Sequence, residues 1–313
     1  MSNVDWHSVT EEVTGYLQEL IRIDTTNPPG NESLAAEYLQ GVLCKEGIDP
    51  VVTESAPGRG NVAARLKGGG APPLMILGHT DVVACEPEHW SHPPFGGDLH
   101  DGCVWGRGAL DMKNMVAAEL MIFLLLKRQG LSFDRDLIFA ATADEEAGKG
   151  DHGVGWLLDH DPDQVEAAHV ITEGGGADFE IGHERFYTCQ TGQKGIFRFR
   201  MKSKGPPGHA SRPEGKSAVV SLSRAVGALG EAELPIHLSQ TVRAFLEGAA
   251  EKRDRRFKRL LSEVLSNDPS EEELLSLPLG GSLKSELPHL LRNTVSPTIL
   301  EAGEKIVGLL LTN

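Results

Sequence analysis

Two amphipathic helices are predicted at the start of the chain. Their apolar residues recur at the three- and four-residue spacing of one helix face. The NPPG segment at 27–30 separates the helices because proline and glycine interrupt helical structure. The apolar residues are Val13, Leu17, Leu20 and Ile21 in the first helix and Leu34, Tyr38, Leu39 and Leu43 in the second.

Short apolar runs then alternate with further helical segments. Strands that alternate with helices are typical of an α/β fold in which helices flank a largely parallel sheet. We therefore expect this fold class. The predicted strands cover 61–68, 72–78, 136–144 and 168–176, and the predicted helices cover 112–128 and 154–160.

The pattern changes near residue 190. Residues 195–205 alternate between apolar and polar side chains like a half-exposed strand, and charged helical segments follow through residue 265. Residues 293–307 predict another strand or a hairpin. We therefore expect two domains, at 1–190 and 191–313.

Composition limits the class of protein. The formal net charge is −15, and nucleic acids and anionic membranes require a basic surface, so neither is expected as a partner. The longest apolar run, 120–126, is too short to span a bilayer. The four cysteines lack C-x-x-C spacing and the N-terminus shows no secretory signal, so we expect a cytoplasmic protein with reduced thiols.

Acidic residues and one histidine follow the predicted strands or precede a helix. Because ligands bind beyond the carboxyl ends of strands in open α/β sheets, we expect these side chains to converge. Crowded carboxylates take up protons unless a cation neutralises them, and nitrogen and oxygen donors suit zinc, manganese or cobalt. Each residue alone has an ordinary interpretation; Asp111, for example, would suit a helix N-cap. The set comprises His79, Asp81, Asp111, Asp144, Glu145, Glu146 and Glu173.

Five motifs occur in order along the chain. They are GHTDVV (78–83), GRGALDMKNMVAA (106–118), ATADEEAG (141–148), ITEGGG (171–176) and GPPGHASRP (205–213). In this order and at these separations they resemble the M20 metallopeptidases, a family of carboxypeptidases, aminoacylases and deacylases of the acetylornithine and succinyl-diaminopimelate type. The resemblance implies a hydrolase that cleaves an amide or peptide bond of a small peptide or N-acyl amino acid through a metal-bridging water.

The resemblance also implies a site with two metal ions, Zn²⁺ or alternatively Co²⁺ or Mn²⁺. His79 and Glu173 would bind one ion, and Glu146 would bind the other. Asp111 would bridge the two ions, and Asp81 would orient the His79 imidazole. Two adjacent cations lower the pKa of a bridging water and stabilise the oxygens of the transition state.

The remaining implied roles concern proton transfer and assembly. Glu145 would be the general base, and His209 would stabilise the oxyanion in the site of the partner subunit. Residues 1–190 would form the metal-binding catalytic domain. Residues 191–313 would form part of a lid domain through which a homodimer assembles.

The chain departs from the family pattern at one metal ligand. The family carries a late histidine in a segment that this chain, ending at residue 313, does not reach. His183, His237 and His289 are the remaining candidates for this ligand. We therefore expect a C-terminally truncated member with a weak second metal site, poor or absent hydrolysis and an exposed strand edge near 293–307.

Two alternatives stay open. The chain is either an active hydrolase or a weak or inactive family member that keeps the fold and one metal site, and that pairs with a relative. A third interpretation, a structural domain without metal, requires the acidic cluster to be accidental.

Overall fold

The chain divides into two compact units, Met1–Gly174 and Gly175–Asn313. Each unit has its own hydrophobic core. The proposed assignment of catalysis and of a lid to separate domains stays a prediction. The computed structural model describes residues 4–301 apart from 149, 175, 177, 182–183, 207–214, 216, 252, 267–269, 278 and 280.

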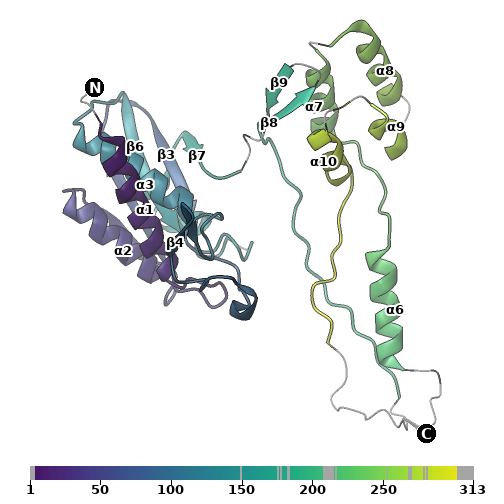
Figure 1. Ribbon diagram of the computed structural model, residues 1–313, viewed down its shortest axis with the longest axis horizontal. Coiled ribbons are helices and arrows are strands. Elements are labelled where there is room, and N and C mark those ends of the chain that lie inside the picture. The colour runs from purple at the N-terminus through teal and green to yellow at the C-terminus, as the bar shows by residue number, and fades with distance from the viewer. Residues whose placement is uncertain are drawn as a thin grey trace. The chain divides into compact units, whose positions relative to one another are not determined.

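The N-terminal unit is built on a five-stranded mixed sheet with strand order β1–β2–β6–β3–β7 (Figure 1). At its centre, β3 (Ala71–His79) runs parallel to β6 (Arg135–Thr142) and to β7 (His169–Ile171). By contrast, β2 (Gly60–Leu66) pairs antiparallel with β6 and with β1 (Val51–Glu54). The predicted α/β class is confirmed, but β6 lies between the two strands that the glycine segment joins in sequence.

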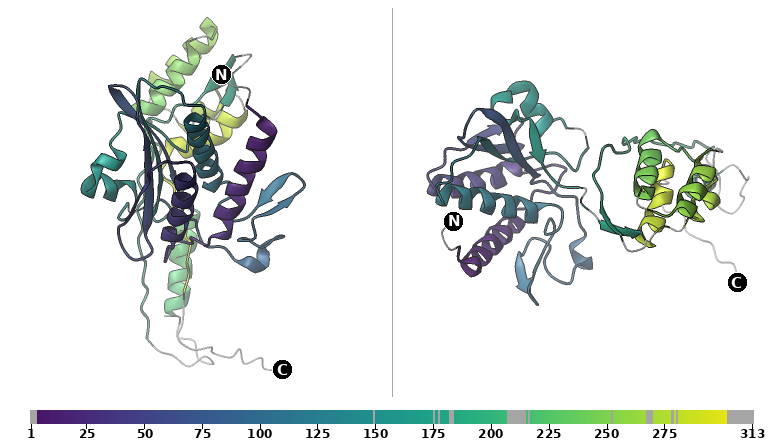
Figure 2. Two further views of the ribbon diagram at one scale, coloured as in Figure 1. Left: turned by 90° about the vertical axis from the view of Figure 1, so that its left-hand side faces the viewer. Right: turned by 90° about the horizontal axis from the view of Figure 1, so that it is seen from above.

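Helices cover both faces of this sheet (Figure 2). On one face α2 and α3 pack against the strands, and α1 packs against α3. On the other face α4 and α5 contribute the buried side chains. These helices are α1 (Trp6–Arg22), α2 (Glu32–Lys45), α3 (Lys113–Arg128), α4 (Val154–His160) and α5 (Pro162–Val165).

The apolar run in β6 explains why the sheet is covered on both faces. Side chains along a strand point alternately to opposite faces. Phe139 and Ala141 join the core beneath α2 and α3, whereas Ile138 and Ala140 join the core beneath α4 and α5. Because β6 is covered on both faces, it is apolar at each position from Leu137 to Ala141.

A smaller hairpin and a short turn of helix complete the unit. The hairpin pairs β4 (Asp98–His100) with β5 (Cys103–Trp105), and the short 3₁₀ turn is η1 (Pro87–His89). Of the helices within the described ranges, none combines the length and apolar character needed to cross a membrane.

The C-terminal unit consists mainly of helices. Apolar residues of α7, α8, α9 and α10 form its main core, and α6 buries none of its side chains. The elements are the paired strands β8 (Asp178–Ile181) and β9 (Glu184–Tyr187), and the helices α6 (Ala218–Gly230), α7 (Gln240–Ala250), α8 (Arg255–Ser266), α9 (Glu271–Leu275) and α10 (Gly281–Leu291).

Two strand predictions in this unit are wrong for the described residues. Residues 195–205 lie in an extended segment without helix or strand, and residues 293–301 likewise form no strand. A strand requires a hydrogen-bonded neighbour, and no described residue pairs with either segment in a sheet. The apolar side chains that alternate here stay exposed, Phe197 to 84%. Residues 302–307 of the second prediction lie outside the described residues.

Candidate metal centre

The parallel strands bring the predicted site residues to one edge of the sheet. His79 is the last residue of β3 and is buried. Glu145 and Glu146 lie in the loop after β6, and Glu173 follows β7 by two residues. Because β3 lies between β6 and β7 in parallel register, the segments that follow these strands meet around His79.

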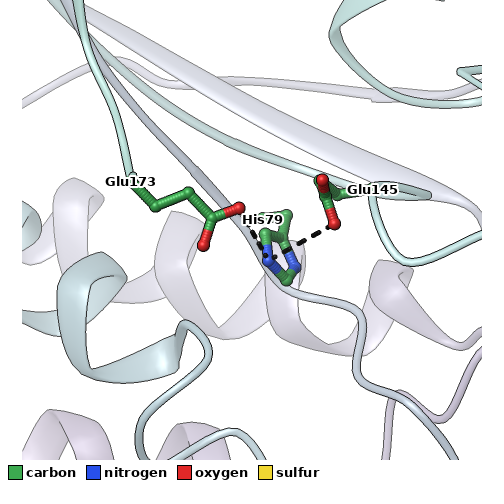
Figure 3. Close-up of side chains that lie close together, drawn as sticks. All are labelled: His79, Glu145 and Glu173. Carbon is green, nitrogen blue, oxygen red and sulfur yellow. Dashed lines mark ion pairs between the residues drawn. The ribbon is translucent and has the colours of Figure 1, made fainter. Parts of the chain in front are cut away.

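The Nε2 atom of His79 faces a group of carboxylates (Figure 3). It lies 3.2 Å from Asp111 Oδ1, 3.4 Å from Glu173 Oε1 and 3.9 Å from Glu145 Oε2. Two sets of three residues each offer ligand atoms within 4.8 Å of one another: His79, Glu145 and Glu173, and His79, Asp111 and Glu146.

Asp81 lies behind the imidazole and is fully buried. The His79 Nδ1 atom is 3.0 Å from the Asp81 backbone carbonyl and 3.4 Å from its carboxylate. The same carboxylate accepts hydrogen bonds from the backbone amides of Glu145 and Glu146, each at 3.1 Å. Asp81 thus directs Nε2 toward the acidic side chains and also holds the loop that carries two of them.

The charges at this site are unbalanced. Burial, followed by the charge of Asp111, raises the pKa values of Glu146 and Glu173. Burial opposes a charge on His79, but hydrogen bonding and charge from Asp81 and the charges of Glu173 and Glu145 outweigh it and raise its pKa to about 9. Within the described residues, no lysine or arginine forms an ion pair with Asp111, Glu145 or Glu173.

This donor set fits a divalent cation. One imidazole nitrogen and several carboxylate oxygens are the ligands that zinc, manganese and cobalt accept. A cation bound at Nε2 would take the place of the imidazole proton and neutralise the surrounding carboxylates. The buried hydrogen bond at Nδ1 leaves Nε2 directed at the group.

Asp111 does not have the capping role that its sequence position would allow. The N-cap residue of α3 is Met112, which makes no side-chain capping hydrogen bond. The Asp111 carboxylate is instead directed to His79 Nε2. The Asp111 carboxylate thus belongs to the group that surrounds His79 Nε2.

The other sequence candidates have separate outcomes. Asp144 follows the same strand as Glu145 but forms an ion pair with Arg59 and belongs to neither ligand set. His237 and His289 also belong to neither set. His209 and His183 lie outside the described residues, so their roles stay predictions.

The sequence reasoning missed several buried polar residues next to the site. Asn27 belongs to the NPPG segment that separates two helices, yet its side chain hydrogen-bonds to Asp81. Arg59 is a lone arginine in a glycine-flanked turn, and no sequence signal marked it. Glu119 is a single acid in the apolar helix α3, which was a signal for a buried charge.

Lys113 is another buried residue that motif spacing alone did not explain. Its Nζ atom donates to the backbone carbonyls of Leu20 at 2.9 Å and Ile23 at 2.8 Å, at the C-terminal end of α1. The first residue of α3 is thus tied to α1. This contact anchors the segment that carries Asp111.

The fold and donor set define a candidate metal-binding α/β protein, and comparison with known proteins gives its family. The model of the peptidase family M20/M25/M40 matches residues 75–272, more than half of the 313 residues. The chain belongs to this family.

Relatives with established names are similar over part of their length. The succinyl-diaminopimelate desuccinylase of Paracoccus denitrificans is 34% identical over 219 residues, which cover 69% of this chain and 55% of the relative. Aminoacylase-1 of Sus scrofa is 30% identical over 217 residues, 68% of this chain and 52% of the relative. The chain spans about half the length of these relatives.

Solved structures support the fold. The di-peptidase Dug1p from Saccharomyces cerevisiae matches with a TM-score of 0.59 at 15% identity, over 96% of this chain and 67% of that one. The M20 family metallo-carboxypeptidase Sso-CP2 from Sulfolobus solfataricus matches with a TM-score of 0.50 at 17% identity, over 84% of this chain and 58% of that one.

Proposed function

We propose that this chain carries the metal centre of a hydrolase that cleaves an amide or peptide bond in a small peptide or an N-acyl amino acid. The observation that carries the proposal is the position of His79 Nε2, within 4 Å of carboxylates from three separate segments. Membership of the M20 family and the names of the relatives support the reaction class.

Four of the residues are proposed as metal ligands. His79 and Glu173 would hold one metal ion and Glu146 the other, and Asp111 would be a ligand that both ions share. Bound metal ions supply Lewis-acid activation of water and of the scissile carbonyl.

Glu145 accepts a proton from the attacking water and donates it to the departing amine. Its backbone amide is held by Asp81, which keeps the carboxylate close to the reacting groups. His209 donates a hydrogen bond to the oxyanion.

The proposal also covers the metal ion, the domain roles, the assembly and the location of the protein. Zn²⁺ is the proposed ion, with Co²⁺ or Mn²⁺ as substitutes, because the donors are imidazole and carboxylate. We further propose a catalytic domain at 1–190, a lid at 191–313, a homodimer formed through the lid, and a cytoplasmic location.

Metal binding and hydrolysis test this proposal together. The metal-free chain is titrated with Zn²⁺ and Co²⁺, and hydrolysis of N-acetyl and N-succinyl amino acids and of dipeptides is then measured. Glu145→Gln should lower kcat by about 100-fold or more, the usual effect of removing a general base, with little change in metal affinity. Glu146→Gln should weaken metal binding, and Glu166→Gln, at an exposed glutamate, is the control.

Three results would contradict the assignment. If the chain binds no metal, the assignment of a metal centre is wrong. If the metal-loaded chain hydrolyses none of these substrates, the proposed hydrolase activity is wrong. If Glu145→Gln loses as much metal affinity as Glu146→Gln, Glu145 is a ligand and not the base.

A further inference from the structure

A buried polar network lies behind the candidate metal centre, and the proposed mechanism uses only one of its members, Asp81. The network also contains Asn27, Glu32, Arg59 and Asp144, all of them buried. Arg59 is its only arginine or lysine. Buried charges persist where they are paired and hydrogen-bonded, so the buried Arg59 guanidinium requires several polar partners.

The Arg59 guanidinium joins three separate segments. Its Nη2 atom donates to Asp144 Oδ1 at 2.7 Å and lies 3.0 Å from Glu32 Oε1, an ion pair without hydrogen-bond geometry. Its Nη1 atom donates to Asn27 Oδ1 at 3.1 Å and to the Pro29 carbonyl at 2.8 Å. The planar fork of arginine can make these contacts at once, whereas a lysine ammonium cannot.

Space for the guanidinium depends on Gly30. A Cβ atom at this position would lie 2.2 Å from Arg59 Nη1. The backbone there is also left-handed, with φ of +83°, which glycine adopts without strain. The chain around 27–30 is thus shaped to admit the arginine.

The network continues from Arg59 to the loop that carries the acids. The Asn27 amide donates to Asp144 Oδ1 at 3.0 Å and to Asp81 Oδ2 at 2.8 Å. Asp81 in turn accepts from the backbone amides of Glu145 and Glu146. Two sets of contacts therefore hold the loop. Arg59 and Asn27 bind the Asp144 carboxylate. Asp81 binds the backbone amides of the next two residues, Glu145 and Glu146.

Asp144 also needs this support for its own conformation. Its φ is +66°, a left-handed backbone that is uncommon for a residue other than glycine. Removing Arg59 would leave Asp144 and Glu32 buried without their cation, and a buried carboxylate that loses its partner is strongly destabilised. The expected response is movement of the Asp144 carboxylate toward water, and the two following glutamates move with it.

We propose that Arg59 is a positioning residue of the metal centre, which holds Asp144 and Asn27 so that the Glu145 and Glu146 carboxylates face His79. This inference rests on the proposed function, because it assigns Arg59 to the geometry of that same centre. The hydrogen bonds and ion pairs of Arg59 within the described residues involve neither His79, Asp111 nor Glu173, so its effect on the centre passes through the loop.

The test compares metal binding in variants of the 313-residue chain. Arg59→Met should weaken Co²⁺ and Zn²⁺ affinity, measured by competition with a chromophoric chelator, by about 10- to 100-fold, the usual effect of losing an outer-shell partner. The visible spectrum of bound Co²⁺ should also change. Asn27→Ala should cause a similar loss, and the double variant should lose less than the sum because both act on one loop.

The matched control lies on β2, the strand that follows Arg59 in the chain. Arg65 is in β2 and pairs with Asp136 at 3.2 Å, so Arg65→Met also removes an arginine–aspartate pair. It should leave both affinity and Co²⁺ spectrum unchanged. Arg59→Lys, which keeps the charge without the fork, should bind metal with an affinity between those of the wild type and Arg59→Met.

The outcomes separate the two proposals. Wild-type affinity and spectrum in Arg59→Met would overturn the positioning role while leaving the metal centre intact. A wild-type chain that binds no metal would overturn both. If Arg59→Met does not fold, as judged by circular dichroism, Arg59→Lys decides: an affinity equal to the wild type overturns the inference, and a reduced affinity supports it.

Discussion

Replacing Glu119 with glutamine should make the N-terminal unit less sensitive to pH. Glu119 lies in α3 with 4% of its surface exposed, and neither carboxylate oxygen has a hydrogen-bond partner. Burial, with a smaller contribution from Glu173, raises its pKa from 4.5 to about 7. The carboxylate therefore opposes folding when it is ionised.

The magnitude follows from the pKa difference. One pKa unit corresponds to about 1.4 kcal/mol, so a rise from 4.5 to about 7 corresponds to about 3 kcal/mol. Between these values the folded protein keeps a proton that the unfolded chain releases. The free energy of unfolding thus falls as pH rises through this window, and the loss is complete above the folded pKa.

Tryptophan fluorescence can follow this unit alone during urea unfolding of the metal-free chain. Relative to Glu119→Gln, the wild type should lose about 3 kcal/mol between about pH 4.5 and pH 8. Glu37→Gln, at an exposed position on α2, should follow the wild type. Parallel pH curves for wild type and Glu119→Gln would refute the reasoning. All four tryptophans belong to the N-terminal unit: Trp6, Trp90, Trp105 and Trp156.

Three further outcomes are expected. Zn²⁺ at 100 times its Kd should stabilise this unit by about 3 kcal/mol, seen as a chelator-reversible rise in Tm that His79→Ala abolishes. Gly78→Ala should cost about 1–3 kcal/mol in urea unfolding, because its Cβ would lie 2.7 Å from Val116, whereas Gly41→Ala, with open space around it, should not destabilise. Leu261→Ala should destabilise the helical core by about 2–5 kcal/mol; an unchanged circular dichroism transition would contradict that packing.

The apolar pattern of the sequence was sufficient to predict a helix or strand where that element buries one regular face of its own. The apolar spacing in α1 and α3 and the apolar run in β6 predicted those elements because each presents a regular face to the core. The α/β class followed from their alternation. The insertion of β6 between β2 and β3 could not be read from the pattern, because strand order depends on hydrogen bonds between distant segments.

The segment at 195–205 shows where the apolar pattern fails to predict structure. Its alternation is that of a strand, but a strand forms only against a neighbour, and the described residues provide none. The side chains of Ile196 and Phe197 therefore stay exposed. Periodicity reports which face a segment can bury and does not report whether another segment covers it.

The sequence by itself determined which residue types lie at the ends of the strands of this protein: an imidazole at one, and carboxylates after two others. Only the tertiary structure decided that His79 Nε2 faces Asp111 and Glu173, and that Arg59 supports the intervening loop through Asp144. The reason is physical. Residue types and spacing are local properties, whereas distances between residues far apart in the chain are determined by sheet register and the packing of helices on the sheet.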